Sequence, residues 1–369
     1  MSKTVASVSG VAIAFSLFQV GSSTLFLLGA PARQDAWLAM LIGALGGFVL
    51  LTMYLLIHKL EPQQDLFELL RHYWGKWLGT LGGLLFIGYF SYEASRTARD
   101  IGELGTLTLL NQTPTAVVIF IAIVVCADVV WFGPRVWFLL CHLFLLMMVL
   151  GYGAILILVS FRGLIHIEFL FPILENGLSP VLKAAIPDII SFPFGQTILF
   201  LVLFKFISDK RKLKRSIMIV YWITAVFLMI VNELSILILG PEFANSSTYP
   251  LFEVTQLIEV PNIIERADVL FAMILFTGTG IKTAGFMFGA VIGLQTVTPL
   301  RYKPSLILLS IIIYALTFLS PRLTDFLWFG LNVALVRIWP IFQIIIPVLL
   351  FLTMLLRKKK RELVKSNCS

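Results

Sequence analysis

The sequence predicts an all-α polytopic membrane protein with about ten transmembrane helices. Its 369 residues are 59% hydrophobic and only 13% charged, and the mean hydropathy is +0.96. A soluble domain cannot bury that much apolar surface. Several apolar stretches approach or exceed the ~18–20 residues with which a helix crosses a bilayer. Helices are expected because lipid offers no water to satisfy the open edges of a sheet.

Hydropathy divides the chain into ten expected spans, with Gly, Pro and charged residues marking the ends. An amphipathic stretch at 66–77, with aromatic and basic residues, is expected to lie at the membrane interface. A polar segment from 240 to about 262 precedes the eighth span. We expect the spans at about 5–31, 35–58, 77–110, 114–132, 135–161, 181–206, 216–239, 263–297, 304–320 and 334–356.

The distribution of basic residues predicts the orientation of these spans. With the N-terminus in the cytoplasm, most of the 28 Lys and Arg residues fall on the inner side, including those of the tail 357–369. This assignment places Arg322 and Arg337 on the outer side. The bias obeys the positive-inside rule and predicts that both termini are cytoplasmic. Because the basic runs directly follow apolar spans, they indicate topology rather than a nucleic-acid partner.

Two interruptions five spans apart indicate an internal repeat. The first span is broken at "VGSS" (20–23) and the sixth at "SFPFGQ" (191–196). The third and eighth spans are both unusually long. Since five is odd, the members of each pair run in opposite directions, which is typical of an inverted 5 + 5 repeat with broken helices 1 and 6. We expect one integral membrane domain over 1–369, with repeats at about 5–161 and 181–356.

The first break provides groups that suit a small polar ligand. An interrupted helix leaves amides and carbonyls without intrahelical partners, and in lipid these groups must meet protein, water or a ligand. Free amides suit a carboxylate and free carbonyls suit an ammonium group, so a zwitterion such as an amino acid fits. The alternative is that the small residues only permit close helix packing. The candidate ligand-binding residues here are Gln19, Val20, Gly21, Ser22 and Ser23.

Charged residues inside the third span provide a second group of candidates. Tyr89 and Glu93 are four residues apart and share a helix face. Such charges cost ~2.5–3.5 kcal/mol at a helix centre and should therefore face the protein interior. Farther out, Arg96–Asp100 and Arg99–Glu103 are opposite charges four apart, and we expect them to pair structurally in an outer vestibule.

Lys282 is the one cation deep in the eighth span, within "FTGTGIKTAGF", and Thr279 lies beside it. In a 5 + 5 repeat the third and eighth spans flank the broken helices. Lys282 could therefore pair with Glu93 beside the breaks, or burial could leave it uncharged, so that it replaces a bound sodium ion or binds a ligand carboxylate. Alternatively, the two residues lie on different faces and reach polar surroundings separately.

Nothing in the sequence indicates an enzyme. It contains no GxSxG, HExxH, Walker A or CxxC motif. Its 3 cysteines and 4 histidines have no metal-ligand spacing. We therefore expect no catalytic residues, no metal and no cofactor.

Three stretches resemble spore germination permeases, the B subunits of endospore germinant receptors. "LFELLRHYWGKWLGTLGGLLFIGYFSYEASRTARDIGEL" (66–104) resembles their second loop and third helix. "SFPFGQTILF" (191–200) resembles the break in their sixth helix. "YPLFEVTQLIEVPNIIERADVLFA" (249–272) resembles the outer segment that leads into helix eight. The resemblance runs over about 5–356.

This resemblance implies an amino acid–polyamine–organocation fold in the inner membrane of a bacterial spore. It implies a larger A subunit and a lipoprotein C subunit as partners, and a small nutrient germinant as ligand. Other members often carry a small apolar residue where Glu93 stands, so a bare aliphatic amino acid is a poor candidate here. By position, the family's pocket falls on Gln19, Val20, Gly21, Ser22, Tyr89, Glu93, Phe194 and Gly195, near Lys282.

Three functions remain open at this point. The chain could be a ligand-sensing subunit, in which the nutrient shifts a conformational equilibrium. It could be a secondary transporter that couples amino acid movement to protons through Glu93 or Lys282. It could also be a channel-forming subunit in which the vestibule charges select ions.

Overall fold

The computed structural model describes residues 6–207, 212–258, 267–320 and 322–366. These residues form helices and contain no strand, apart from one isolated bridge between Ala6 and Ile207. The predicted starts of the first and eighth spans, part of the 249–272 segment and the last residues of the tail lie outside the described residues. The elements are α1 (Val8–Val20), η1 (Ala30–Asp35), α2 (Ala36–Leu60), α3 (Leu66–Thr108), α4 (Thr115–Trp131), α5 (Pro134–Phe161), η2 (Ile167–Leu170), α6 (Leu178–Lys183), η3 (Ala184–Phe194), η4 (Gly195–Leu199), α7 (Phe200–Leu203), η5 (Phe204–Phe206), α8 (Leu213–Leu239), α9 (Pro241–Ser246), α10 (Pro250–Gln256), α11 (Ala267–Val297), α12 (Tyr302–Leu316), α13 (Leu323–Trp328), η6 (Phe329–Ile338), η7 (Ile341–Ile345) and α14 (Ile346–Ser366).

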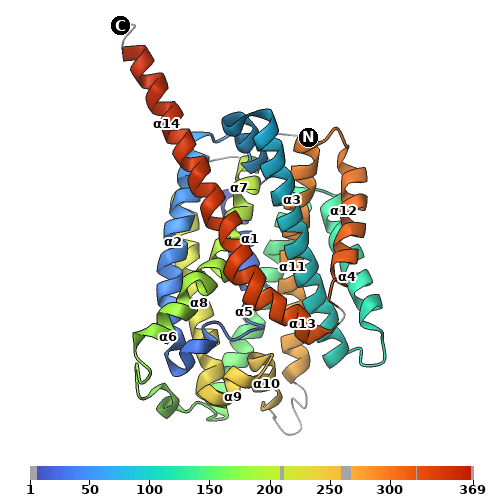
Figure 1. Ribbon diagram of the computed structural model, residues 1–369. Coiled ribbons are helices and arrows are strands. Elements are labelled where there is room, and N and C mark those ends of the chain that lie inside the picture. The colour runs from blue at the N-terminus through green and yellow to red at the C-terminus, as the bar shows by residue number, and fades with distance from the viewer. Residues whose placement is uncertain (1–5, 208–211, 259–266, 321, 367–369) are drawn as a thin grey trace.

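The described helices account for ten crossings of a membrane. The charged helix α3 supplies one, and the shorter apolar helices α1, α4 and α12 supply three more. In Figure 1, α1 begins and α14 ends at the same end of the bundle, as an even number of crossings requires. The remaining six are the long apolar segments Ala30–Leu60, Pro134–Phe161, Leu178–Phe206, Leu213–Leu239, Val269–Val297 and Leu323–Lys358.

The helix α11 packs closely along α3 and against the interrupted helices. A Cβ atom on Gly289 would lie 2.5 Å from Leu199 Cδ1, and one on Gly293 would lie 2.3 Å from Phe67 Cζ. Small residues let helices approach where the hydrophobic effect gives no drive to associate within lipid. Glycines along α11 therefore bring the third and eighth spans to the centre of the bundle, beside the breaks.

The first span is interrupted, as predicted, but it does not resume as an α-helix. The last α-helical hydrogen bond runs from Gly21 N to Leu17 O. Two hydrogen bonds that span three residues instead of four follow, from Ser23 N to Val20 O and from Leu25 N to Ser22 O. The chain then continues through turns to η1. We call residues 21–29 the first break. A second α-helical half is missing because Gly29 (φ 76°) and Arg33 (φ 51°) both have left-handed backbone angles.

Asn232 of α8 supports the first break in place of helical bonds. Its Oδ1 accepts from Leu28 N at 2.7 Å, and its Nδ2 donates to Leu28 O at 3.0 Å. The hydroxyls of Thr24 and Tyr152 are 2.6 Å apart and hold the middle of the segment. Side chains of neighbouring helices thus satisfy backbone groups that an unbroken helix would satisfy itself.

The sixth span is interrupted at two points, each of which precedes a proline. Ile186 (φ −125°, ψ 116°) and Phe192 (φ −131°, ψ 115°) both have extended backbone angles. The ring of a following proline clashes with a helical conformation at the residue before it. The predicted break at 191–196 is confirmed, and Pro187 adds an earlier one. We call residues 186–194 the second break.

Residues 66–74 form a helical segment that a kink at Gly75 (φ 82°) separates from the rest of α3, and the side chains of Leu66, Phe67, Leu69 and Leu70 are fully buried in the protein. One expectation about helix extent is wrong. The tenth span begins at Leu323 rather than near 334. Polar residues such as Asp325 and Asn332 concealed its first turns, so Arg337 lies inside this span and not on the outer side.

Candidate ligand-binding site

A small polar pocket lies between the two breaks. The free space in it measures about 10 Å³ for the centre of a water-sized sphere, which is roughly room for one water molecule. Side chains from four parts of the fold nearly fill it. We call this space the polar pocket. It is lined by Ser22, Phe26, Glu93, Arg96, Thr97, Asp100, Phe192, Gln196, Leu331, Leu335 and Trp339.

Glu93 of α3 presents a carboxylate to the polar pocket. The Glu93 side chain is 1% exposed. Gln196 follows the second break, and its Nε2 donates to Glu93 Oε2 at 2.6 Å. Glu93 Oε1 and Gln196 Oε1 are buried and have no hydrogen-bond partner in the described protein. Leaving such an atom unpaired costs ~1–3 kcal/mol. Two acceptors therefore remain for a donor that enters the pocket.

Lys282 of α11 connects the two breaks. Its side chain is fully buried, and Nζ donates to Ser22 Oγ of the first break at 3.2 Å. The same Nζ lies 4.5 Å from the ring centroid of Phe192 in the second break, a cation–π distance. In the described structure Lys282 and Glu93 form no ion pair. Ser22 and Phe192 hold the ammonium group, whereas Gln196 holds the carboxylate.

The first break packs against α11 backbone to backbone. A Cβ atom on Gly278 would lie 3.1 Å from both Gly21 Cα and Gly21 O, and one on Gly21 would lie 2.9 Å from Lys282 Cδ. A larger side chain at either position would therefore crowd its neighbours. This contact agrees with the packing alternative for Gly21. It also places Ser22 beside Lys282, so packing and a ligand site are compatible here.

Tyr89, Phe194 and Gly195 form a layer that does not line the polar pocket. Gln343 Nε2 donates to the Tyr89 hydroxyl at 2.7 Å, and the Tyr89 ring stacks on Phe342 at 4.8 Å. A Cβ atom on Gly195 would lie 2.2 Å from Gln343 Oε1. Phe194 packs against α2, where a Cβ atom on Gly47 would lie 2.3 Å from Phe194 Cβ.

The other predicted site residues are buried near the first break or on α11. The Ser23 hydroxyl donates to Gln19 O at 2.5 Å, and the Thr279 hydroxyl donates to Leu275 O of its own helix at 2.6 Å. Val20 is 6% exposed. Gln19 is fully buried, and neither polar atom of its side chain has a partner in the described protein. Of the predicted residues, Ser22 and Glu93 line the polar pocket, and Gly21 and Lys282 contact its wall.

Sequence analysis missed the role of Arg96. The expected Arg96–Asp100 pair is wrong for the described residues: Arg96 Nη1 instead donates weakly to Gly330 O at 3.4 Å, and its guanidinium lies 5.0 Å from the Trp339 ring. No local sequence pattern predicts this contact with η6. Gln196 belongs to the break motif "SFPFGQ", whereas no sequence pattern marked Trp339 as a pocket residue.

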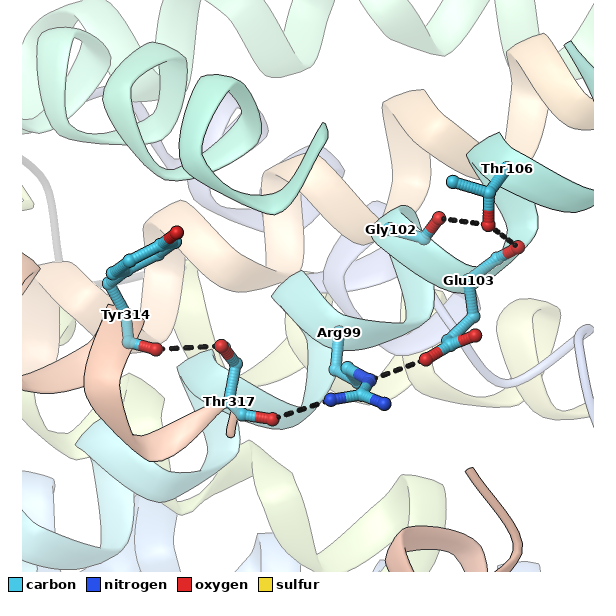
Figure 2. Close-up of polar contacts among 6 residues, drawn as sticks. All are labelled: Arg99, Gly102, Glu103, Thr106, Tyr314 and Thr317. Carbon is cyan, nitrogen blue, oxygen red and sulfur yellow. Dashed lines mark hydrogen bonds and ion pairs between the residues drawn. The ribbon is translucent and has the colours of Figure 1, made fainter. Parts of the chain in front are cut away.

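The expected Arg99–Glu103 pair is confirmed. Arg99 Nε donates to Glu103 Oε1 at 2.6 Å, one turn along α3 (Figure 2). Arg99 Nη1 also donates to Thr317 O at 2.9 Å, at the end of α12 (Figure 2). The pair therefore fastens α3 to the end of the ninth span, away from the polar pocket.

Solved structures share this fold over most of the chain. MhsT in complex with L-phenylalanine superposes with a TM-score of 0.67 at 14% identity, covering 92% of this chain and 88% of that one. A manganese transporter from Eremococcus coleocola superposes with a TM-score of 0.60 at 18% identity, covering 87% and 70%. They confirm the predicted fold class, with broken first and sixth helices.

Sequence relatives identify the family. The family model described as spore germination protein matches residues 6–326. Spore germination protein KB of Bacillus subtilis (strain 168) is 31% identical over 375 residues, covering 100% of this chain and 99% of that protein. Spore germination protein B2 of the same strain is 27% identical, covering 84% and 85%. The chain belongs to the spore germination protein family.

Proposed function

We propose that this chain is the B subunit of a germinant receptor, which binds a small nutrient in the polar pocket and so triggers spore germination. The observation that carries the proposal is the meeting of both breaks, Glu93 and Lys282 around one buried space. Charged side chains within membrane spans are rare and usually functional. Buried acceptors without a hydrogen-bond partner are also few in native proteins.

The chemistry of the pocket favours an amino acid or a similar polar nutrient. Glu93 and Asp100 supply carboxylates for an ammonium group, and Arg96 and Lys282 supply cations for a carboxylate. Trp339 adds an indole face. A bare alanine-like nutrient would leave part of this charge unmatched, whereas a ligand with a further polar group would use it. The L-phenylalanine bound by the structural neighbour MhsT supports the amino acid class.

Nutrient binding requires the polar pocket to expand. Its free space of about 10 Å³ holds one water molecule but no amino acid. We therefore assign the described conformation to the closed, resting state. A nutrient would stabilise an expanded state by its differential affinity for the two states, and partner subunits would respond to that shift.

The proposed setting is the spore inner membrane, with a larger A subunit and a lipoprotein C subunit as partners. The start of α1 and the end of α14 lie on one side of the bundle (Figure 1), and we place that side in the cytoplasm because the basic residues 357–361 lie near the end of α14. We also retain the proposed repeat boundaries at about 5–161 and 181–356, each of which contains one break.

The test is nutrient binding by the purified chain in lipid nanodiscs. A panel of single amino acids, sugars and nucleosides is screened by thermal shift, followed by germination of spores that carry each variant. We expect at least one nutrient to stabilise the wild type, and Glu93→Gln or Ser22→Ala to abolish that stabilisation and the response to that nutrient. Thr279→Ala, which does not alter the pocket lining, is the matched control. Equal binding by all three variants would exclude the polar pocket.

Active transport is the second candidate, because the structural neighbours are transporters. In liposomes, a transporter would accumulate the nutrient when a pH gradient is imposed, and Glu93→Gln would abolish uptake. A sensor would bind the nutrient without accumulating it. A variant that still takes up the nutrient in liposomes but no longer supports germination would show that transport and sensing are separate functions.

A further inference from the structure

Arg337 lies at the depth of the polar pocket but on the opposite side of its helix. Leu335 and Trp339, two residues before and after it, both line the pocket and are 6% and 2% exposed. Arg337 itself is exposed. It lies within the apolar segment Leu323–Lys358. The guanidinium therefore leaves the protein inside an apolar segment, level with the polar pocket.

This guanidinium has no partner within the described chain. None of the described ion pairs, hydrogen bonds or cation–π contacts involves Arg337. Arg96 on α3, by contrast, reaches a carbonyl and two aromatic rings. An arginine at the centre of a membrane helix costs ~2.5–3.5 kcal/mol on insertion scales, and such residues are almost always paired.

The surface around Arg337 has the composition of a helix-packing face. Asn332, one wide turn earlier, is exposed; its Nδ2 donates to Trp328 O, and its Oδ1 accepts no hydrogen bond from the described residues. Apolar side chains continue the strip. In Figure 1 the tenth span crosses the front of the bundle, and no other helix covers it in that view. The apolar part of the strip comprises Val336, Ile341 and Ile345, which are 37%, 42% and 51% exposed.

We infer that this face of the tenth span, Asn332 to Ile345, docks a transmembrane helix of a partner protein that carries a carboxylate at the level of the polar pocket. The carboxylate pairs with the planar fork of Arg337, and a hydroxyl or amide donor one turn away meets Asn332 Oδ1. A lipid phosphate is the weaker occupant because phosphates lie at the interface, whereas Arg337 lies level with the polar pocket. The inference does not depend on which nutrient the pocket binds.

The test compares complex size for charge variants expressed in their native membranes. An affinity-tagged chain is extracted in mild detergent and run on native gels. We expect Arg337→Leu and Arg337→Glu to shift the chain to its own size, while Arg337→Lys retains part of the larger complex. Arg322→Leu removes a cation from the outer end of the same span and should leave the complex intact.

A charge swap identifies the partner helix. Second-site suppressors of Arg337→Glu are selected, and we expect an Asp or Glu replaced by Lys or Arg within a transmembrane helix of another protein, with the large complex restored. An unchanged complex in Arg337→Glu would overturn the inference. So would a bound phospholipid, seen by native mass spectrometry, that Arg337→Leu removes while complex size stays constant.

Folding of each variant is checked separately. Nutrient-induced thermal shift of the isolated chain should be the same for wild type and Arg337→Leu, because the side chain does not line the polar pocket. If Arg337→Leu does not fold, Arg337→Gln and Arg337→Lys provide the comparison. Absence of nutrient binding in the wild type, with the complex still lost in Arg337→Glu, would contradict the proposed function but not this docking surface.

Discussion

The two breaks form the polar pocket in different ways. The first break is held by its neighbours: Asn232 binds the backbone of Leu28, and Gly21 packs on Gly278. The second break results from its own prolines and contributes the Phe192 side chain to the pocket, and Gln196 follows it in η4. One break thus depends on tertiary contacts and the other on local sequence. We expect the first break to move when a nutrient expands the pocket, and the second to remain as a fixed wall.

The largest effect is expected at Asn232. Asn232→Leu leaves the N–H and C=O of Leu28 without their partners at 2.7 and 3.0 Å. Each unpaired buried group costs ~1–3 kcal/mol, so the free energy of unfolding should fall by roughly 2–6 kcal/mol. Unfolding in mixed micelles with increasing SDS measures it. Asn332→Leu on the surface of the tenth span is the control, and an equal loss in both variants would contradict a supported first break.

The next effect concerns the glycine contact between the first break and α11. Gly278→Ala would place a methyl group 3.1 Å from Gly21 Cα, and we expect a loss of about 1–3 kcal/mol from overpacking. Gly280→Ala meets nothing within 4 Å and should stabilise the helix by about 0.5–1 kcal/mol. Effects of opposite sign in the same unfolding assay would sharpen the comparison. A loss at Gly280 as large as that at Gly278 would mean that close approach is not the cause.

A smaller effect is expected at Gly195, beside the second break. A Cβ atom there would meet Gln343 Oε1, the end of a flexible side chain, which can move away at the cost of its bond to Tyr89. We expect Gly195→Ala to cost about 0.5–1.5 kcal/mol, the value of one hydrogen bond. The double variant Gly195→Ala with Gln343→Ala should recover part of the loss. No recovery would place the strain elsewhere in the second break.

The smallest effect is expected at Thr279. The sequence predicted this residue as a ligand contact, but its hydroxyl bonds to Leu275 O of α11, and it does not line the polar pocket. Thr279→Ala should change the free energy of unfolding by about 0.5 kcal/mol or less and leave the nutrient thermal shift unchanged. A strong loss of nutrient response in this variant would mean that the expanded state differs from the closed one on this face of α11.

Local patterns made most of the fold predictable. Apolar length located the crossings, and Gly21, Pro193 and Gly195 located the breaks, because these residue types act on their own backbone. Contacts between distant helices had no such signal. The position of Arg96 under Trp339 and the contact between Gly21 and Gly278 depend on which helices meet, and so does the burial of the first turns of α3. The composition of the pocket could therefore be predicted in part, but its wall formed by the tenth span could not.

The most direct test of the ligand site is the rate at which position 22 reacts with a thiol reagent. Ser22→Cys is introduced into a chain whose native cysteines are replaced, and the rate of reaction with a small thiol reagent is measured with and without the nutrient that gives a thermal shift. Ser160→Cys, on the exposed end of α5, is the control. Because Ser22 is 2% exposed in the closed state and the nutrient stabilises an expanded one, we predict that the nutrient changes the rate of modification at position 22 and leaves position 160 unchanged. Equal rates at position 22 with and without the nutrient would place the binding site elsewhere.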